Sequence, residues 1–278
     1  MENEFELGNG VKIPALGLGT WQSTGNDVYW AVKYALEEGY IHIDTAEMYE
    51  NEAEIGKAIA DVAREKIFIT SKLWMSNLDY DKAHEALKGS LERLGTNYLD
   101  LYLIHWPSND MDIEGTFKAF KEMLDSGKVK AVGVSNFTVE HLKTTLPFAK
   151  KHGITISANQ VEYHPGLNQQ ELLHFCTENN IRLIAYSPLA RGKIFEMDIL
   201  SKIAGQHNKT VGQVSLRWLL QKGLAVIPKA SSKEHIKENK DIFDFELRDE
   251  EMTQIDEMGN NERILNPGFA MFDEPLKL

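Results

Sequence analysis

Four side chains that could together donate a proton to a substrate are Asp44, Tyr49, Lys72 and His105. Asp44, Lys72 and His105 each follow a short apolar run, which is typical of a buried strand that ends on a polar residue. Tyr49 comes shortly after Asp44, in a predicted loop. Because the carboxyl ends of parallel strands meet at one rim, we expect these four side chains to share a pocket.

The chemistry that suits these residue types is the reduction of a carbonyl group. Hydride delivery to a carbonyl carbon leaves charge on the oxygen, which a proton donor must neutralise. The pKa of free tyrosine is about 10, and we expect the ammonium of Lys72 to lower the pKa of Tyr49. Asp44 would keep Lys72 protonated, and His105 would donate to the carbonyl oxygen. The sequence therefore predicts a reductase with Tyr49 as general acid.

Polar or aromatic side chains also follow the other apolar runs. They are Thr20, Trp21, Ser135, Asn136, Gln160, Tyr186 and Lys229. Packing or a buried hydrogen bond would explain any one of them. Their occurrence at successive strand ends is what indicates a common site.

The elements that must position these residues alternate along the chain as short apolar strands and amphipathic helices. The eight predicted strands begin near residues 15, 41, 67, 98, 129, 155, 181 and 224. A hairpin over residues 4–13 precedes them, and helical stretches near 197–207, 210–222, 233–240 and 248–257 surround the last strand. This pattern predicts a (β/α)8 TIM barrel with an N-terminal β-hairpin cap and two extra helices, in a single domain over residues 1–278.

The composition excludes several classes of partner. The 278 residues carry a formal net charge of −12, whereas nucleic acid and anionic membranes require a basic surface. The single cysteine, Cys176, cannot form an internal disulfide, and no signal peptide or apolar run of spanning length is present. We therefore expect a soluble cytoplasmic protein with Cys176 packed in its core.

Eight motifs resemble those of the aldo-keto reductases and occur in the order that this family shows. They are Gly17-Leu18-Gly19-Thr20-Trp21, residues 42–49, Ile69-Thr70-Ser71-Lys72-Leu73-Trp74, residues 100–107, Gly133-Val134-Ser135-Asn136-Phe137, Asn159-Gln160-Val161-Glu162, Ala185-Tyr186-Ser187-Pro188-Leu189 and Ile227-Pro228-Lys229. Within the family, the chain is most similar to compact prokaryotic reductases related to 2,5-diketo-D-gluconate reductase.

The resemblance implies a catalytic tetrad of Asp44, Tyr49, Lys72 and His105, and a monomer that binds NADP(H). The implied cofactor contacts are Thr20, Ser135, Asn136, Gln160, Tyr186, Ser187, Leu189, Lys229, Ser231, His235, Glu238 and Asn239. Three of them, Ser135, Asn136 and Gln160, would bind the nicotinamide carboxamide, and Tyr186 would stack on the nicotinamide ring. Ser187 and Leu189 would contact the pyrophosphate.

The stretch 229–239 departs from the family's pattern for binding the 2′-phosphate of NADP(H). Ala230 replaces a serine, and His235 stands where the family has an arginine. Histidine is largely neutral at pH 7 and lacks the planar fork of a guanidinium. We therefore expect NADP(H) to be used with a reduced preference and NAD(H) as well, with residues 231–233 as compensating groups. The alternative is that Lys229 suffices and His235 is a solvated helix residue.

Three tryptophans, Trp21, Trp74 and Trp106, each follow a strand and predict an aromatic wall that binds small aldehydes and ketones. The loops after residues 107 and 189 are short, which favours an open site. The tail, residues 260–278, either folds over this pocket or packs on the barrel rim.

Two other functions compete with the reductase. A metal-dependent hydrolase is disfavoured because the nine histidines show no His-x-His or His-Glu-x-x-His spacing and Lys72 would repel a cation, so we expect no metal site. A non-catalytic or very slow nicotinamide-binding sensor or interaction subunit of the same fold stays open, although the complete tetrad argues for activity.

Overall fold

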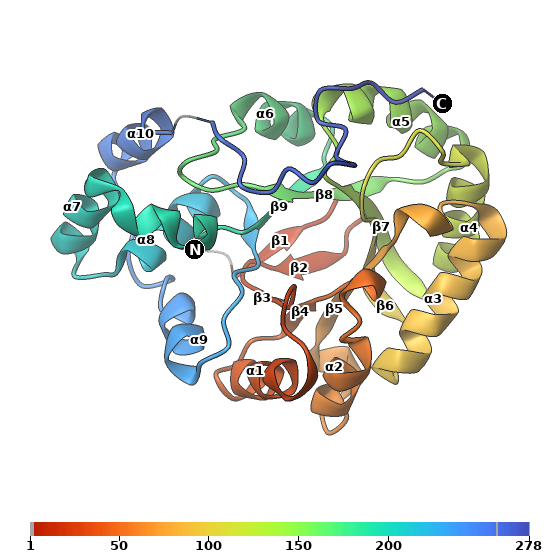
Figure 1. Cartoon of the computed structure of the whole chain (residues 1–278), viewed down its shortest axis with the longest axis horizontal. Coiled ribbons are helices and arrows are strands. Elements are labelled where there is room, and N and C mark those ends of the chain that lie inside the picture. The colour runs from red at the N-terminus through yellow and green to blue at the C-terminus, as the bar shows by residue number, and fades with distance from the viewer. Residues whose placement is uncertain (1–2, 260, 278) are drawn as a thin grey trace.

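The structure, a computed structural model, describes residues 3–259 and 261–277. Eight parallel strands form a barrel that helices surround (Figure 1). Around the barrel they are β3 (Leu18–Gly19), β4 (His42–Asp44), β5 (Phe68–Leu73), β6 (Leu99–Ile104), β7 (Val129–Ser135), β8 (Ile156–Glu162), β9 (Arg182–Tyr186) and β10 (Ala225–Val226). A parallel bridge between Leu16 and Val226 joins the two ends of the sheet. The predicted (β/α)8 fold is confirmed.

The helices begin and end close to the positions that periodicity predicts. They are α1 (Gly25–Glu37), α2 (Glu52–Ile59), α3 (Tyr80–Leu94), α4 (Ile113–Asp125), α5 (Val139–Lys151), α6 (Gln170–Glu178), α7 (Asp198–His207), α8 (Val211–Gln221), α9 (Lys233–Lys240) and α10 (Asp249–Glu257). Short 3-10 turns occur at η1 (Glu47–Tyr49), η2 (Arg64–Lys66), η3 (Met75–Asn77) and η4 (Ala190–Glu196). No helix among the described residues is long and apolar enough to cross a membrane.

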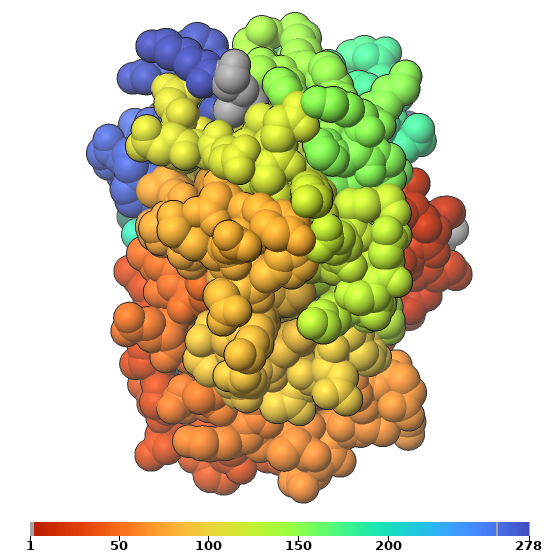
Figure 2. All heavy atoms as spheres, turned by 90° about the vertical axis from the view of Figure 1, so that its right-hand side faces the viewer, coloured from red at the N-terminus to blue at the C-terminus, as the bar shows by residue number. Residues whose placement is uncertain are grey.

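The N-terminal hairpin closes one end of the barrel. Strands β1 (Glu4–Glu6) and β2 (Lys12–Pro14) pair antiparallel, and Gly10 in the turn has a φ of +83°, which glycine adopts without strain. Leu7 and Ile13 are fully buried and pack against the inner face of the barrel. Figure 2 shows this hairpin (dark red) and the C-terminal segment (blue) at opposite ends of the molecule. The open end is therefore the end at which the strands finish.

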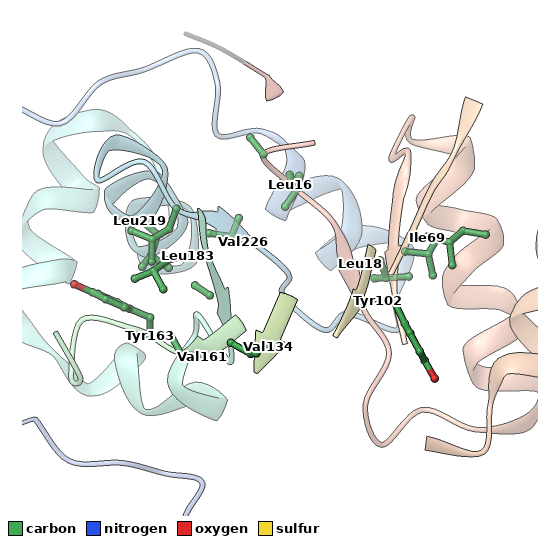
Figure 3. Packing of buried hydrophobic residues seen from close by; sticks show 14 of the residues in the cluster. Leu16, Leu18, Ile69, Tyr102, Val134, Val161, Tyr163, Leu183, Leu219 and Val226 are labelled. Atoms are coloured by element: carbon green, nitrogen blue, oxygen red, sulfur yellow. The ribbon is translucent and has the colours of Figure 1, made fainter. Parts of the chain in front are cut away.

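Alternating residues of each strand separate two apolar cores. In β6, Leu101 and Leu103 point into the barrel, whereas Tyr102 and Ile104 pack outward against the helices. Figure 3 shows the outer core, with Tyr102 from β6 and Val134 from β7. Cys176 is buried in this outer core, as predicted. Because side chains alternate in direction, a strand that is apolar throughout can still end on a residue that points into the open end.

Candidate functional site

A buried ion pair lies at the open end of the barrel, between neighbouring strands. Lys72 Nζ on β5 lies 2.5 Å from Asp44 Oδ1 at the end of β4, and both side chains are almost fully buried. The same ammonium donates to the backbone oxygen of Thr45 at 2.8 Å and to Tyr49 Oη at 3.3 Å. Gln160 Nε2 donates to the other Asp44 oxygen at 2.6 Å. Asp44 and Lys72 are thus satisfied by protein groups, and Lys72 connects the carboxylate to the phenol.

Burial and charge act in opposite directions on these groups. Burial raises the pKa of Tyr49 above its ordinary value, and the Lys72 ammonium only partly opposes that rise. The expected net decrease is therefore wrong, although Lys72 acts in the predicted direction. For Lys72 itself, burial lowers the pKa, but Asp44 and Tyr49 outweigh it, so the pKa is raised and the side chain is an ammonium.

His105 follows β6 and lies beside both the phenol and an indole. Its ring centroid is 5.5 Å from that of Tyr49 and 5.1 Å from that of Trp74. Burial, with a smaller contribution from Lys72, lowers the pKa of His105 well below its ordinary value, so the imidazole is neutral. Its buried Nδ1 has no hydrogen-bond partner among the described residues. A neutral ring with Nδ1 unprotonated leaves Nε2–H as its donor.

A second group of polar side chains lies across the barrel from Tyr49, at the ends of β7, β8 and β9. Ser135 Oγ donates to the backbone oxygen of Gln160 at 2.8 Å. Asn136, whose φ is +66°, donates to the backbone oxygen of His105 at 3.0 Å and accepts from Tyr186 Oη at 2.8 Å. Asparagine adopts this left-handed conformation more readily than other non-glycine residues, and Asn136 lines the mouth of the barrel. The amides and hydroxyls match the donors and acceptors of a carboxamide.

One cavity of about 590 Å³ brings most of the predicted residues together. The predicted residues that line it are Thr20, Trp21, Asp44, Tyr49, Trp74, His105, Trp106, Ser135, Asn136, Gln160, Tyr186, Ser187, Leu189 and Lys229. Lys72 does not line the cavity and reaches it through Tyr49 Oη. Side chains from all parts of the barrel thus converge on one opening that is mostly apolar with a few polar groups, as small-molecule sites are.

The remaining predicted cofactor residues lie outside this cavity. Ser231 is exposed before α9, His235 is exposed on that helix, and Glu238 Oε1 accepts from Thr210 Oγ1 at 2.6 Å. Asn239 is buried. Lys229 alone connects the stretch to the cavity, and its ammonium donates to the backbone oxygen of Gln22 at 3.3 Å.

Two of the groups that were expected to compensate for the missing arginine are already engaged. Lys233 Nζ lies 2.8 Å from Glu37 Oε2 of α1. Ser232 is the N-cap of α9, where its hydroxyl accepts from the backbone N–H of His235 at 3.2 Å. Of the three compensating residues, only Ser231 has no such engagement within the described chain.

The C-terminal segment lines the cavity as a third wall. Leu265, Pro267 and Phe269 contact the opening, and the Phe269 ring lies 5.7 Å from Trp74 and 5.3 Å from Trp106. Of the two placements left open for the tail, the structure thus shows the one over the pocket; residues 260 and 278 lie outside the described part. The aromatic wall contains a phenylalanine in addition to the three predicted tryptophans.

A buried carboxylate on β8 anchors this segment. The two oxygens of Glu162 accept from the backbone N–H groups of Ile264 at 2.8 Å and Leu265 at 2.9 Å. His164 Nε2 lies 2.9 Å from the same carboxylate. Burial alone would raise the pKa of Glu162, but the hydrogen bonds from His164, Ile264 and Leu265 outweigh it and lower the pKa. Glu162 is therefore a charged acceptor that fixes the start of the tail.

Sequence reasoning missed several cavity residues because they lie in loops without periodicity. Met48, Phe195 and Phe269 line the cavity although each is about half exposed, which is unusual for large apolar side chains. Arg191, which the sequence marks either as a cation for an anionic ligand or as a solvated surface charge, was not missed and also lines the cavity. The available signal was the position of Met48 and Phe195 after predicted strand ends. Nothing local in the sequence marks Phe269 as a neighbour of Trp106.

Comparison with known proteins agrees with this geometry. The model of the Aldo/keto reductase family matches residues 15–260. The glyoxal reductase of Bacillus subtilis is 45% identical over 98% of this chain and 99% of its own. The glycerol 2-dehydrogenase (NADP(+)) of Saccharomyces cerevisiae is 39% identical over 97% and 96% of the two chains.

A solved structure shows the same arrangement of elements. The aldose reductase from Schistosoma japonicum superposes with a TM-score of 0.91 at 36% identity, over 99% of this chain and all of the other. These matches cover the motifs on which the resemblance was based and the elements that position the cavity. The chain is an oxidoreductase that belongs to the aldo/keto reductase family.

Proposed function

We propose that this protein reduces aldehydes and ketones to alcohols, with NADPH as the hydride donor and Tyr49 as the general acid. The observation that carries the proposal is the contact of Lys72 with both Asp44 and Tyr49, beside a neutral His105 at the floor of an open cavity. The name of the Bacillus subtilis relative, a glyoxal reductase, supports small carbonyl compounds as substrates.

The residues around the cavity fit a nicotinamide cofactor. The Ser135, Asn136 and Gln160 side chains would bind its carboxamide, and the aromatic ring of Tyr186 would flank the nicotinamide ring. Asn136 fixes the Tyr186 hydroxyl at 2.8 Å and so orients that ring. Further along the cavity, Ser187 and Leu189 would contact the pyrophosphate. When bound, the cofactor supplies a hydride to the carbonyl carbon.

The protein's own groups then supply the proton. His105 Nε2–H would donate to the carbonyl oxygen and orient it, because its low pKa keeps it a neutral donor. As negative charge develops on that oxygen, the Tyr49 O–H would transfer its proton to it, which yields the alcohol. Lys72 at 3.3 Å would stabilise the resulting phenolate, and Asp44 would keep Lys72 charged.

For the cofactor preference, we propose that NADPH is favoured over NADH only moderately. Two observations support this proposal. Ala230 and His235 stand in place of a serine and an arginine, and Lys233 is paired with Glu37. Lys229, which lines the cavity, remains available to bind a phosphate. The NADP(+) in the name of the yeast relative supports use of the phosphorylated cofactor.

The test measures loss of NADPH absorbance, and separately of NADH absorbance, with methylglyoxal and with benzaldehyde. Replacement Tyr49→Phe should lower kcat by about 10²–10⁴-fold because the general acid is lost. Cofactor binding, measured by fluorescence titration, should be unchanged in this variant because Tyr49 is not among the residues proposed to bind the cofactor. Tyr29→Phe is the matched control, because Tyr29 is a partly buried tyrosine of α1 that does not line the cavity.

Each outcome separates the candidate functions. No turnover by the wild type despite tight cofactor binding would favour the nicotinamide sensor or interaction subunit. Unchanged turnover in Tyr49→Phe would show that another group donates the proton. A ratio of catalytic efficiencies for NADPH over NADH above roughly a thousand, which corresponds to ~4 kcal/mol, would contradict dual use of the cofactors.

We also propose that the protein works as a cytoplasmic monomer formed by a single domain. The net charge of −12 and the single buried cysteine support this placement. Light scattering should give the mass of one chain, 31.6 kDa.

A further inference from the structure

Arg191 is a cation at the mouth of the cavity, in η4. Its guanidinium carbon lies 4.6 Å from the centre of the Trp21 ring, and its side chain is exposed. It also lies close enough to Tyr186 to act on the pKa of that phenol. The residue therefore faces both the predicted substrate wall and the side chain proposed to flank the nicotinamide.

Arg191 differs from the other cations of the site in having no partner. Lys72 is paired with Asp44, and the Lys229 ammonium donates to the backbone oxygen of Gln22. Within the described chain, the Arg191 guanidinium makes no ion pair or hydrogen bond, and it lies over the Trp21 ring. Among the described residues, the only carboxylate that lines the cavity is that of Asp44, which Lys72 and Gln160 already satisfy. An acidic protein thus presents unpaired positive charge at the entrance to its site.

The backbone places Arg191 at some cost. Ala190 has a φ of +49° and Arg191 a φ of +50°, a left-handed conformation that non-glycine residues rarely adopt. Two hydrogen bonds maintain it, from Ala190 N to Ser187 O and from Gly192 N to Leu189 O, each 2.8 Å long. A strained backbone conformation of this kind is kept only where surrounding contacts hold it in place, and such positions occur often at ligand sites.

The rim around Arg191 is apolar. Met48, Phe195 and Phe269 line the cavity with 45%, 56% and 42% of their surface exposed. They account for three of the five large apolar side chains that are exposed in the described residues. Exposed apolar surface that gathers around one opening indicates a ligand with an apolar body. An unpaired guanidinium binds planar anions such as carboxylates. The apolar rim and Arg191 together therefore fit a ligand with an apolar body and an anionic end.

We propose that Arg191 binds the carboxylate of the substrate, and that the site prefers carbonyl compounds in which an apolar or aromatic body separates the carbonyl group from a carboxylate. This inference rests on the proposed carbonyl reductase function and names the substrate class of the same cavity. The tetrad would engage the carbonyl end, the rim would cover the apolar body, and Arg191 would meet the anionic end. Lys229, which contacts Gln22 rather than Trp21, is left for the phosphates of the cofactor.

The experiment compares 4-carboxybenzaldehyde with benzaldehyde, which share the reacting group and differ in the carboxylate. Arg191→Gln should lower kcat/KM for the acid about tenfold, as loss of one charge-assisted contact does, and change the value for benzaldehyde less than about twofold. Lys193→Gln is the matched control, because Lys193 is an exposed cation two residues away that does not line the cavity. The loss in Arg191→Gln should shrink as salt is raised, since an exposed charge pair is screened.

Two results would overturn the proposal. An equal loss for both aldehydes with a higher Kd for NADPH would assign Arg191 to the phosphates of the cofactor instead. Unchanged kinetics for both aldehydes would make Arg191 a surface cation. Calorimetric titration of NADP⁺-bound protein with each aldehyde reports binding without turnover. A preference for the acid that Arg191→Gln abolishes would therefore support the proposal even if the reductase function failed, and equal affinity of the wild type for both compounds would refute it.

Discussion

Proton donation in the proposed reaction depends on the charge states of three neighbouring side chains. The raised pKa of Tyr49 keeps the phenol protonated well above neutral pH, and the lowered pKa of His105 keeps the imidazole neutral well below it. Lys72, whose pKa is raised, stays an ammonium throughout. Reduction needs the protonated phenol, so its rate should fall only as the pH rises through the raised pKa of Tyr49.

We therefore predict that kcat for the reduction of benzaldehyde by NADPH is constant from about pH 6 to about pH 9, because the pKa values of Tyr49, Lys72 and His105 are all shifted away from that range. In the reverse direction Tyr49 must accept a proton, so alcohol oxidation should accelerate with pH over the same range. Initial rates in both directions across this pH range, with an uncharged substrate, provide the measurement. A step in the reduction profile near the ordinary pKa of histidine would show that the charge of His105 matters and that its pKa is not lowered.

At the scale of single residues, the sequence was a good guide to position and a poor one to energetics. Asp44, Lys72 and His105 could be proposed from apolar runs that end on polar groups, and Tyr49 from its position in the loop after Asp44. The structure brings the four together. The net pKa change of Tyr49 could not be predicted, because it is the difference between two opposing effects, desolvation of the phenol and attraction by the Lys72 ammonium. Desolvation depends on every atom packed around the phenol.

Among the elements, the tail is anchored at its start by one buried side chain of β8. Glu162 accepts two backbone N–H groups from residues 264–265, and that segment leads directly to the wall formed by Leu265, Pro267 and Phe269. The pKa of Glu162 is lowered. Docking of the tail should therefore be complete above the ordinary pKa of a glutamate and weaken as the pH falls through the lowered value.

We predict that Glu162→Gln loosens the tail by about 1–3 kcal/mol, because glutamine has one acceptor oxygen where the carboxylate has two, so one of the two backbone N–H groups of the tail loses its acceptor. Cleavage by trypsin after Arg263 should then accelerate by about tenfold or more, and KM for benzaldehyde should rise as the aromatic wall is displaced. Glu274→Gln is the control, since Glu274 is an exposed tail residue whose carboxylate makes no hydrogen bond in the described chain. Equal protease resistance of the wild type and Glu162→Gln would show that other contacts dock the tail.

Element positions were largely predictable. The strands and helices begin within a few residues of the positions that periodicity indicated, because each buried face is encoded locally. The placement of segments without periodicity could not be predicted from the sequence. The sequence left both placements of the tail open, and it offered Lys233 as a phosphate ligand although that lysine pairs with Glu37, nearly 200 residues earlier. Such pairings are determined by packing of α9 against α1.

In the whole molecule, the hairpin that closes the core and the candidate site lie at opposite ends of the barrel. The hairpin seals one end through Leu7 and Ile13, whereas the site opens at the end where the C-terminal segment lies. Figure 2 shows the hairpin and the C-terminal segment on opposite sides of the molecule. A barrel needs both ends of its core covered, because apolar residues at an open end would otherwise meet water. Damage to the hairpin should therefore affect folding more than catalysis.

We predict that Leu7→Ala and Ile13→Ala each destabilise the protein by about 2–5 kcal/mol, as fully buried side chains do when truncated. This should lower Tm by about 2–4 °C for each kcal/mol, while kcat at 25 °C stays within about twofold of the wild type. Thermal unfolding followed by circular dichroism, with initial rates on the same samples, provides the measurement. Val11→Ala, at a partly exposed hairpin position, should change Tm much less. A fall in kcat as large as the loss of stability would mean that the two ends are coupled.

The sequence by itself determined the barrel, the order of its strands and the polar residues that end them. Hydrophobic periodicity and chain order are properties of the sequence and do not depend on which residues come into contact. Only the tertiary structure decided the net pKa of Tyr49, the docking of the tail on Glu162, the engagement of Lys233 by Glu37 and the position of Arg191 over Trp21. Each of these depends on burial or on a contact between residues far apart in the chain. The free energy of such a contact depends on how closely the folded chain brings the groups together and how much water it removes.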